Sequence, residues 1–223
     1  MSIIKLEHVE YSVLTKYTEL LILKDISFQV EIGECHLITG PSGSGKTTLL
    51  QIIGTLLNQT NGRRELFGED INEKTPEKIL YQIRKKIGYL FQSPYLPKNL
   101  SVIDYVSYKS QLVGDGLFTA EKKAEEHLTS LDMTEFIKGK ISDLSGGEKQ
   151  RVALAGILAM NVDVLLLDEP TGSLDYNNAT KLWDIIKKLK EKGLTIITVT
   201  HDKSIEEIAD CIHYLDYGKL KIH

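Results

Sequence analysis

The most constraining feature of this chain is the stretch 40–47, which reads Gly-Pro-Ser-Gly-Ser-Gly-Lys-Thr. It matches the P-loop pattern, in which two glycines five positions apart are followed by Lys and then by Ser or Thr. The apolar run 35–39 before it predicts a short buried strand, and residues 48–53 after it predict the start of a helix. A strand, a glycine-rich turn and a helix in this order are the context in which the pattern binds phosphate.

The pattern also predicts which atoms would hold a nucleotide. Gly43 and Gly45 allow backbone conformations closed to other residues, so the loop amides can surround an anion at the positive end of the helix dipole. We expect Lys46 to reach the outer phosphates and the Thr47 hydroxyl to hold a magnesium ion. A flexible turn with a surface lysine is the weaker alternative. The expected ATP-binding residues here are Gly40, Pro41, Ser42, Gly43, Ser44, Gly45, Lys46, Thr47 and Thr48.

Length and composition limit the class of protein. The 223 residues have the composition of an ordinary globular protein, and the net charge of −4 gives no reason to expect nucleic-acid binding. Cys35 and Cys211 lie in apolar runs and predict small core residues in a reducing compartment. The N-terminus lacks the pattern of a signal peptide, and the longest apolar run, 152–160, is too short to cross a bilayer. We therefore expect no direct membrane insertion.

The predicted fold class is α/β, with a P-loop NTPase core built on a mainly parallel sheet. Apolar alternation over 3–13 and 22–32 predicts an additional antiparallel β-subdomain. The helix after the P-loop is expected to end near Leu57. From about 100 to 141 the apolar spacing is wholly helical, which predicts an inserted α-helical subdomain. The single domain 1–223 is thus divided into a core of about 1–99 and 142–223 and a helical insert of about 100–141.

Tyr11 lies in the predicted β-subdomain. Its ring is a candidate for stacking on a nucleobase, because any exposed aromatic ring can stack. A half-buried strand tyrosine is the alternative.

Polar side chains follow two further predicted strands. Asp168 and Glu169 come directly after the apolar run 164–167, and His201 follows the buried strand predicted over 194–199. The carboxyl ends of parallel strands share one edge of a sheet, where ligands of open α/β folds bind. Asp168 could orient magnesium-bound water, and Glu169 could polarise an attacking water. We expect His201 to approach the γ-phosphate, although a lone histidine after a strand is usually structural.

Two further segments carry candidate residues. Gln92 ends a short predicted strand, and the loop 93–97 after it places Tyr95 and Leu96 between two prolines, which predicts an exposed apolar pair. The Ser145-Gly146-Gly147 turn precedes a helix predicted over 149–160 and is a second candidate anion site. An ordinary helix cap is the alternative for this turn.

In this order the motifs resemble those of the nucleotide-binding subunits of ABC transporters, over nearly the whole chain. Stretch 40–47 is similar to the family's Walker A loop, Gln92 to its Q-loop glutamine, and Leu144 to Glu148 to its signature sequence. Residues 164–168 resemble the Walker B strand, and residues 173–175 resemble the D-loop. Glu169 is similar to the family's catalytic glutamate, and His201 is similar to its switch histidine. The residues in and around these motifs are most similar to those of the lipoprotein-release and macrolide-export branch. The family's base-stacking aromatic would fall near Val13, so Tyr11 would have to substitute for it.

The resemblance implies an ATPase that needs ATP and Mg²⁺, with Thr47, Gln92 and Asp168 near the metal and Glu169, His201 and Gln92 in catalysis. It implies a head-to-tail homodimer in which Ser145, Gly146, Gly147 and Glu148 contact the partner's ATP. A transmembrane permease would be the other partner, which places the chain in the cytoplasm against the inner face of the cell membrane. Its cycle would power an exporter or a lipid- or peptide-extruding transporter.

Three other functions compete. A regulatory module that transmits force to a membrane partner without moving a substrate fits the same motifs. Soluble ABC ATPases of ribosomes or DNA usually carry two cassettes or long coiled coils, neither of which this sequence shows. A small P-loop kinase would leave the signature turn unexplained.

Overall fold

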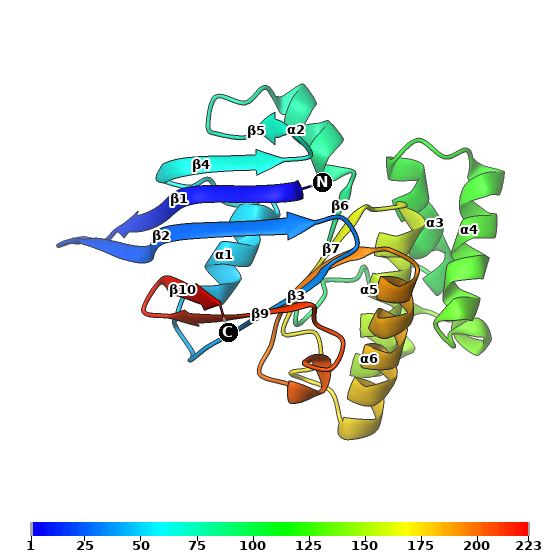
Figure 1. Cartoon of the computed structure of the whole chain (residues 1–223). Helices are drawn as coiled ribbons and strands as arrows, with labels where there is room; N and C mark the ends of the chain where they lie inside the picture. Colours follow the sequence, from blue (N-terminus) through cyan, green and yellow to red (C-terminus); the bar gives the residue numbers. More distant parts are fainter. Residues whose placement is uncertain (1, 223) are drawn as a thin grey trace.

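The computed structural model describes residues 2–222, and its strands form two sheets (Figure 1). The smaller sheet is antiparallel, with strand order β2-β1-β4-β5. Ile26, Phe28 and Val30 alternate with exposed residues and are all buried, as the sequence period predicts. Its strands are β1 (Ser2–Leu14), β2 (Glu19–Glu31), β4 (Asn61–Leu66) and β5 (Glu69–Asp70).

The larger sheet has the order β10-β9-β3-β8-β7-β6, and all neighbours are parallel except β10, which runs antiparallel to β9. Every residue of β7 and β8 is buried, as expected for central strands covered on both faces. Its strands are β3 (Cys35–Thr39), β6 (Ile87–Leu90), β7 (Val164–Asp168), β8 (Thr195–Val199), β9 (Cys211–Asp216) and β10 (Lys219–Ile222).

Helix α1 (Lys46–Ile53) lies between the two sheets (Figure 1). The expectation that this helix extends to Leu57 is wrong. Thr55 has a φ of +59°, which ends the helix. The buried Arg64 guanidinium then donates hydrogen bonds to carbonyls near this helix end. Its Nη1 donates to the Ile52 carbonyl and, at 2.9 Å, to the Leu57 carbonyl. A cation at the negative end of a helix dipole is favourable.

Helices α5 (Gly146–Ala159) and α6 (Tyr176–Glu191) lie on the other face of the large sheet, and α3 (Val102–Leu112) and α4 (Leu117–Ser130) pack against α5. Helices α3 and α4 are consecutive and fall inside the segment predicted to be a helical insert. They stand beside α5 at one end of the molecule (Figure 1). The remaining helical segments are α2 (Glu77–Arg84), η1 (Thr134–Phe136), η2 (Ile141–Asp143) and η3 (Lys203–Ile205).

The predicted α/β architecture with its antiparallel sheet is confirmed, but two local expectations are wrong. Helix α5 begins at Gly146 and not at residue 149, because Ser145 caps it directly. In the loop after β6, Tyr95 is 92% exposed, whereas Leu96 is only 6% exposed and belongs to the core under the helices. The two residues therefore do not form an exposed apolar pair.

Candidate functional site

The site is built at one edge of the large sheet, where three neighbouring strands end. Strand β3 leads into the loop 40–45 and then into α1, β7 ends at Asp168, and β8 is followed by His201. The parallel pairing sets Ile38 beside Val199 and Val199 beside Asp168, so the three ends are level. The topology thus delivers the predicted residues to one place.

The loop before α1 has the conformation of a phosphate-binding turn. Gly43 and Gly45 have φ values of +77° and +105°, which favour glycine. Gly40 has no room for a side chain, since a Cβ there would lie 2.0 Å from the Leu215 carbonyl oxygen. The turn of the loop therefore depends on glycine for backbone shape and for close packing.

Lys46 is the first residue of α1 and is buried. Its Nζ donates to the carbonyls of Gly40 and Pro41 at 2.8 and 2.9 Å, so the ammonium closes across the loop. Burial lowers the pKa of Lys46, and the charges of Glu169 and Asp168 oppose that shift. A buried cation in this position is suited to an anionic ligand.

Asp168 joins the loop to the end of β7. The Thr47 hydroxyl donates to its Oδ1 at 3.0 Å, and the Tyr89 hydroxyl donates to its Oδ2 at 3.1 Å. Burial, together with the Asp168 charge, raises the pKa of the Tyr89 phenol, so it stays a donor. A hydroxyl and a carboxylate are the hard oxygen ligands that suit Mg²⁺ when phosphates and water complete the shell. Within residues 2–222, no group of three or more His, Cys, Asp or Glu forms a ready-made metal cage.

Glu169 and His201 face each other beside the loop. The His201 Nε2 lies 3.4 Å from the Glu169 Oε1, and their side chains are 56% and 22% exposed respectively. Glu169 has a φ of +46°, a conformation that costs energy for a residue with a side chain and is typical of functional positions. Both residues line a cavity of about 420 Å³, with Ile22, Ser42, Gly43, Gly45, Lys46, Thr47, Thr48 and Val199.

Tyr11 and Gln92, like the predicted Gly40, Pro41, Ser44 and Asp168, are not among the residues lining this cavity. Tyr11 is half-buried and packs on the core cluster between the sheets, and Ile22 of β2 borders the cavity instead. The exposed Gln92 packs on Gly172, where an added Cβ would lie 2.9 Å from its Nε2. The Gln150 amide holds this region by donating to the carbonyls of Phe91, Gln92 and Pro170.

The signature turn lies at the start of α5 and is also separate from the cavity. Ser145 accepts from the Glu148 amide at 3.4 Å, and the Glu148 carboxylate accepts from the Ser145 amide at 2.7 Å, which forms a capping box. Ser145 and Gly146 are exposed. The N-terminus of α5 is thus well capped and exposed at the surface.

The side chain of Asn178 supports this turn, and sequence reasoning missed it. A Cβ on Gly147 would lie 2.8 Å from the Asn178 Cγ. Asn178 donates to the Asp175 carboxylate and accepts from Arg151 at 3.2 Å. The segment 173–175 and the signature turn are therefore tied together within one chain.

A second missed group lies behind His201. The carboxylate of Asp202 accepts from the Trp183 indole at 2.6 Å and from the Thr171 hydroxyl at 3.2 Å. The adjacency of Asp202 to His201 was the available sequence signal. Its two side-chain partners could not be found without the fold, because they are 19 and 31 residues away.

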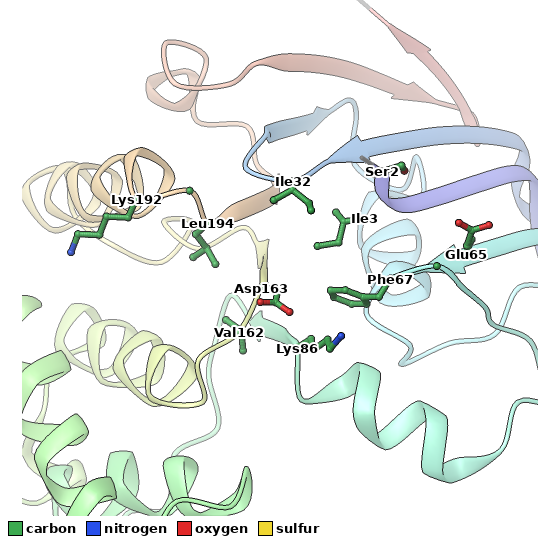
Figure 2. Close-up of a pocket in the computed structure, with 12 residues that line it drawn as sticks. Ser2, Ile3, Ile32, Glu65, Phe67, Lys86, Val162, Asp163, Lys192 and Leu194 are labelled. Carbon is green, nitrogen blue, oxygen red and sulfur yellow. The ribbon is translucent and has the colours of Figure 1, made fainter.

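A cavity of about 740 Å³ lies elsewhere (Figure 2). It is bordered by residues that precede β6, β7 and β8, so it lies at the edge of the sheet opposite the P-loop. Figure 2 shows the ring of Phe67 and the side chain of Ile3 facing it from the small sheet. The other lining residues are Ser2, Ile32, Glu65, Gly68, Lys86, Val162, Asp163, Lys192, Gly193 and Leu194.

Residues 23–172 match the family model described as ABC transporter, which is well over half of the chain. The chain belongs to the ABC transporter family. It is an ATP-hydrolysing cassette of that family, and the matched span includes the P-loop 40–47, Gln92, the turn 144–148 and Asp168-Glu169. In the part of the chain that the structure describes, no helix has both the length and the apolar character needed to cross a membrane.

Several known proteins resemble this ABC cassette. It is 39% identical to ABC transporter H family member 2 of Dictyostelium discoideum, over 89% of this chain and 39% of the relative. It is 36% identical to the macrolide export ATP-binding/permease protein MacB of Bartonella henselae, over 91% of this chain and 31% of the relative. It therefore spans about a third of the length of these two relatives. HrtA of Staphylococcus epidermidis, an ATP-binding protein provisionally named for hemin import, is 38% identical over 90% of both chains.

Solved structures agree with this assignment. A dimeric bacterial ABC transporter cassette superposes with a TM-score of 0.89 at 33% identity, covering 98% of both chains. A dimeric ATP-binding cassette in a post-hydrolysis state, bound to ADP and phosphate, gives a TM-score of 0.87 at 32% identity over 98% of both chains. The predicted family, fold class and ATPase activity are thus confirmed.

Proposed function

We propose that this ABC cassette forms an ATP-bound homodimer that powers a transmembrane permease. The observation that carries the proposal is the position of the signature turn. Ser145 and Gly146 are exposed at a helix start and lie outside the cavity lined by the chain's own P-loop. An anion site that does not meet its own nucleotide is suited to the nucleotide of a second copy. A head-to-tail pair would give two equivalent sites, each completed by the other subunit.

Within each site the chain's own residues divide the work. The amides of the loop 40–45 and the Lys46 ammonium would hold the phosphates, and the Thr47 hydroxyl and the Asp168 carboxylate would hold Mg²⁺, with Gln92 as a further candidate ligand. When bound, Mg²⁺ supplies charge neutralisation between the phosphate oxygens. Glu169 polarises a water and accepts its proton as that water attacks the γ-phosphorus and ADP departs. His201 donates to the γ-phosphate and is held near Glu169.

The permease is proposed to dock where the core meets the helical insert. The Tyr95 ring is almost fully exposed, follows Gln92 closely and precedes the buried Leu96, which fixes the loop to the helices. Contact at Tyr95 would let a partner respond when Gln92 shifts. The name of the MacB relative describes it as an ATP-binding/permease protein, which supports a membrane partner for this chain. That partner would hold the cassette on the inner face of the cell membrane.

We further propose export or extrusion as the type of transport, on the similarity to the macrolide-export relatives. A force-transmitting regulatory module on a membrane partner remains the second candidate, since the same exposed signature turn and Tyr95 loop would serve it. Reconstitution of the complex into vesicles separates the two functions. Export predicts ATP-dependent movement of a substrate, whereas a regulatory module would hydrolyse ATP without such movement.

The docking proposal is tested by co-purification. Tyr95→Ser should reduce recovery of the membrane subunit and its stimulation of ATP hydrolysis, while basal hydrolysis by the isolated cassette stays within about twofold of the wild-type rate. Tyr217→Asn is the matched control, because this tyrosine is also exposed but lies in the β9–β10 turn, at a positive φ that Asn tolerates. Unchanged assembly of the Tyr95→Ser cassette with its permease would place the docking surface elsewhere.

A further inference from the structure

Asp202 makes more hydrogen bonds than its position as a cap requires. It precedes the short η3 segment, and its Oδ1 accepts from the Ser204 amide at 3.0 Å, which is an ordinary capping bond. Its other oxygen, Oδ2, accepts from both the Trp183 indole and the Thr171 hydroxyl. Capping explains one oxygen and leaves the two bonds to the other oxygen unexplained.

The bond from Thr171 connects the segments that carry Glu169 and His201. Thr171 is two residues after Glu169, and Asp202 is one residue after His201. The Thr171–Asp202 bond therefore closes a short bridge between the two segments beside the point where the Glu169 and His201 side chains approach to 3.4 Å. The Asp202 amide also donates to the Thr200 hydroxyl at 3.1 Å, which shapes the turn around His201.

Trp183 fixes this bridge to α6. The indole is buried, and its 2.6 Å bond to a carboxylate is short, as expected when the acceptor is charged. Burial would raise the pKa of Asp202, but the bonds from Trp183, Ser204 and Thr171 outweigh it and the pKa is lowered. The carboxylate is thus kept as an acceptor for all its partners.

We propose that Asp202 is a positioning residue, which sets the distance between Glu169 and His201 by holding their segments to each other and to Trp183. The inference rests on the proposed roles of Glu169 and His201 in hydrolysis. Asp202 touches no reacting atom and acts through the two segments that it joins. Trp183, the only tryptophan in the chain, then reports directly on this bridge.

The test compares Asp202→Ser with the wild type, because serine can still cap η3 but is too short to reach both Trp183 and Thr171. We expect kcat to fall roughly 10- to 100-fold, as for a small misplacement of catalytic groups, while KM for ATP stays within about twofold. The thermal midpoint should fall by several degrees at most, because the buried Trp183 N–H loses its acceptor at a cost of about 1–3 kcal/mol. Thr171→Val should show the same loss in kcat, and Thr171→Ser, which keeps the hydroxyl, should restore it.

Two readouts do not depend on activity. Without nucleotide, the Trp183 emission should shift in Asp202→Ser, and amide hydrogen exchange around His201 should accelerate. Since both segments depend on one bridge, the pair Thr171→Val and Asp202→Ser should together lose no more kcat than Asp202→Ser alone. If the wild type itself does not hydrolyse ATP, the proposed function fails, and emission and exchange still decide whether the bridge holds the His201 segment.

The inference is overturned if Asp202→Ser keeps wild-type kcat, emission and exchange, because Asp202 then only caps η3. It is also overturned if Asp202→Ser lowers both kcat and the thermal midpoint while Thr171→Val and Trp183→Phe remain fully active. In that case Asp202 contributes to general stability and not to the position of the two side chains.

Discussion

The Thr47 hydroxyl donates a 3.0 Å hydrogen bond to the Asp168 carboxylate, which joins the start of α1 to the end of β7 across 121 residues of sequence. The fold itself therefore brings together the two side chains that are proposed to bind the metal. Asp168→Asn removes the charge but preserves the shape of the side chain. We expect a loss of hydrolysis of about 100-fold or more, because a metal held by one carboxylate depends on that charge.

The measurement for Asp168→Asn is binding of a fluorescent ATP analogue with and without Mg²⁺. Magnesium should strengthen binding to the wild type and have little effect on the variant, while binding without the metal stays similar in both. Thr47→Ser, which keeps the hydroxyl, serves as the control and should respond to magnesium like the wild type. An equal magnesium effect in wild type and Asp168→Asn would show that the metal lies elsewhere.

The close packing of Gly147 on Asn178 predicts a difference between two neighbouring glycines. A Cβ at Gly147 would lie 2.8 Å from the Asn178 Cγ, whereas one at Gly146 meets nothing within 4 Å. Gly147→Ala should therefore destabilise the nucleotide-free protein by about 1–3 kcal/mol through overpacking. Gly146→Ala should be neutral or slightly stabilising, because alanine favours a helix.

Urea unfolding of the two alanine variants measures this difference, and Asn178→Ala provides a rescue. Removing the Asn178 side chain should make Gly147→Ala less costly than it is in the wild-type background. Equal free energies of unfolding for Gly146→Ala and Gly147→Ala would contradict the packing that ties the signature turn to α6.

A buried histidine pair predicts how stability changes with pH. The His36 Nδ1 and His213 Nε2 are 2.9 Å apart, and the Glu34 carboxylate lies 2.9 Å from the His36 Nε2. Burial, and then the proximity of His36, lowers the pKa of His213 to about 4. His213 therefore binds a proton less readily in the folded protein than in the unfolded chain. Its contribution to the free energy of unfolding is complete above the unfolded pKa of about 6.5 and is lost as the pH falls toward 4.

Between pH 7.5 and pH 5.0 the His213 contribution to the free energy of unfolding should fall by about 2 kcal/mol, at roughly 1.4 kcal/mol per pH unit below 6.5. Urea titrations at the two pH values measure it, and His213→Gln, which does not titrate, should lose most of the difference. The carboxylates with lowered pKa, such as Glu34 and Asp210, act mainly below this window. If His213→Gln keeps the full pH dependence of the wild-type free energy of unfolding, that dependence does not come from His213.

Much of this site follows from short sequence patterns because its residues lie in local motifs at strand ends. The P-loop, Asp168, Glu169 and His201 are each adjacent to a strand that is recognisable from its own apolar run. Parallel pairing then brings the strand ends together, which is a property of the fold class.

The remaining features depend on contacts between distant segments. Trp183 and Asn178 occupy one helix whose periodicity shows only that part of it is buried, and nothing in the sequence links them to Asp202 or Gly147. The end of α1 cannot be predicted locally, because the buried Arg64 that binds the carbonyls of Ile52 and Leu57 comes from β4. The burial of Leu96 cannot be predicted either, because prolines indicate a loop but do not show which of its side chains reaches the core.

In the proposed cycle, two copies of this chain enclose ATP and separate when Glu169 promotes its hydrolysis. Size-exclusion chromatography with light scattering on Glu169→Gln tests this cycle, because the amide keeps the shape of the side chain but cannot accept a proton. With MgATP the variant should elute as a dimer, and adding Ser145→Arg should return it to the monomer. A Glu169→Gln protein that stays monomeric with saturating MgATP, while the wild type hydrolyses ATP, would contradict the account.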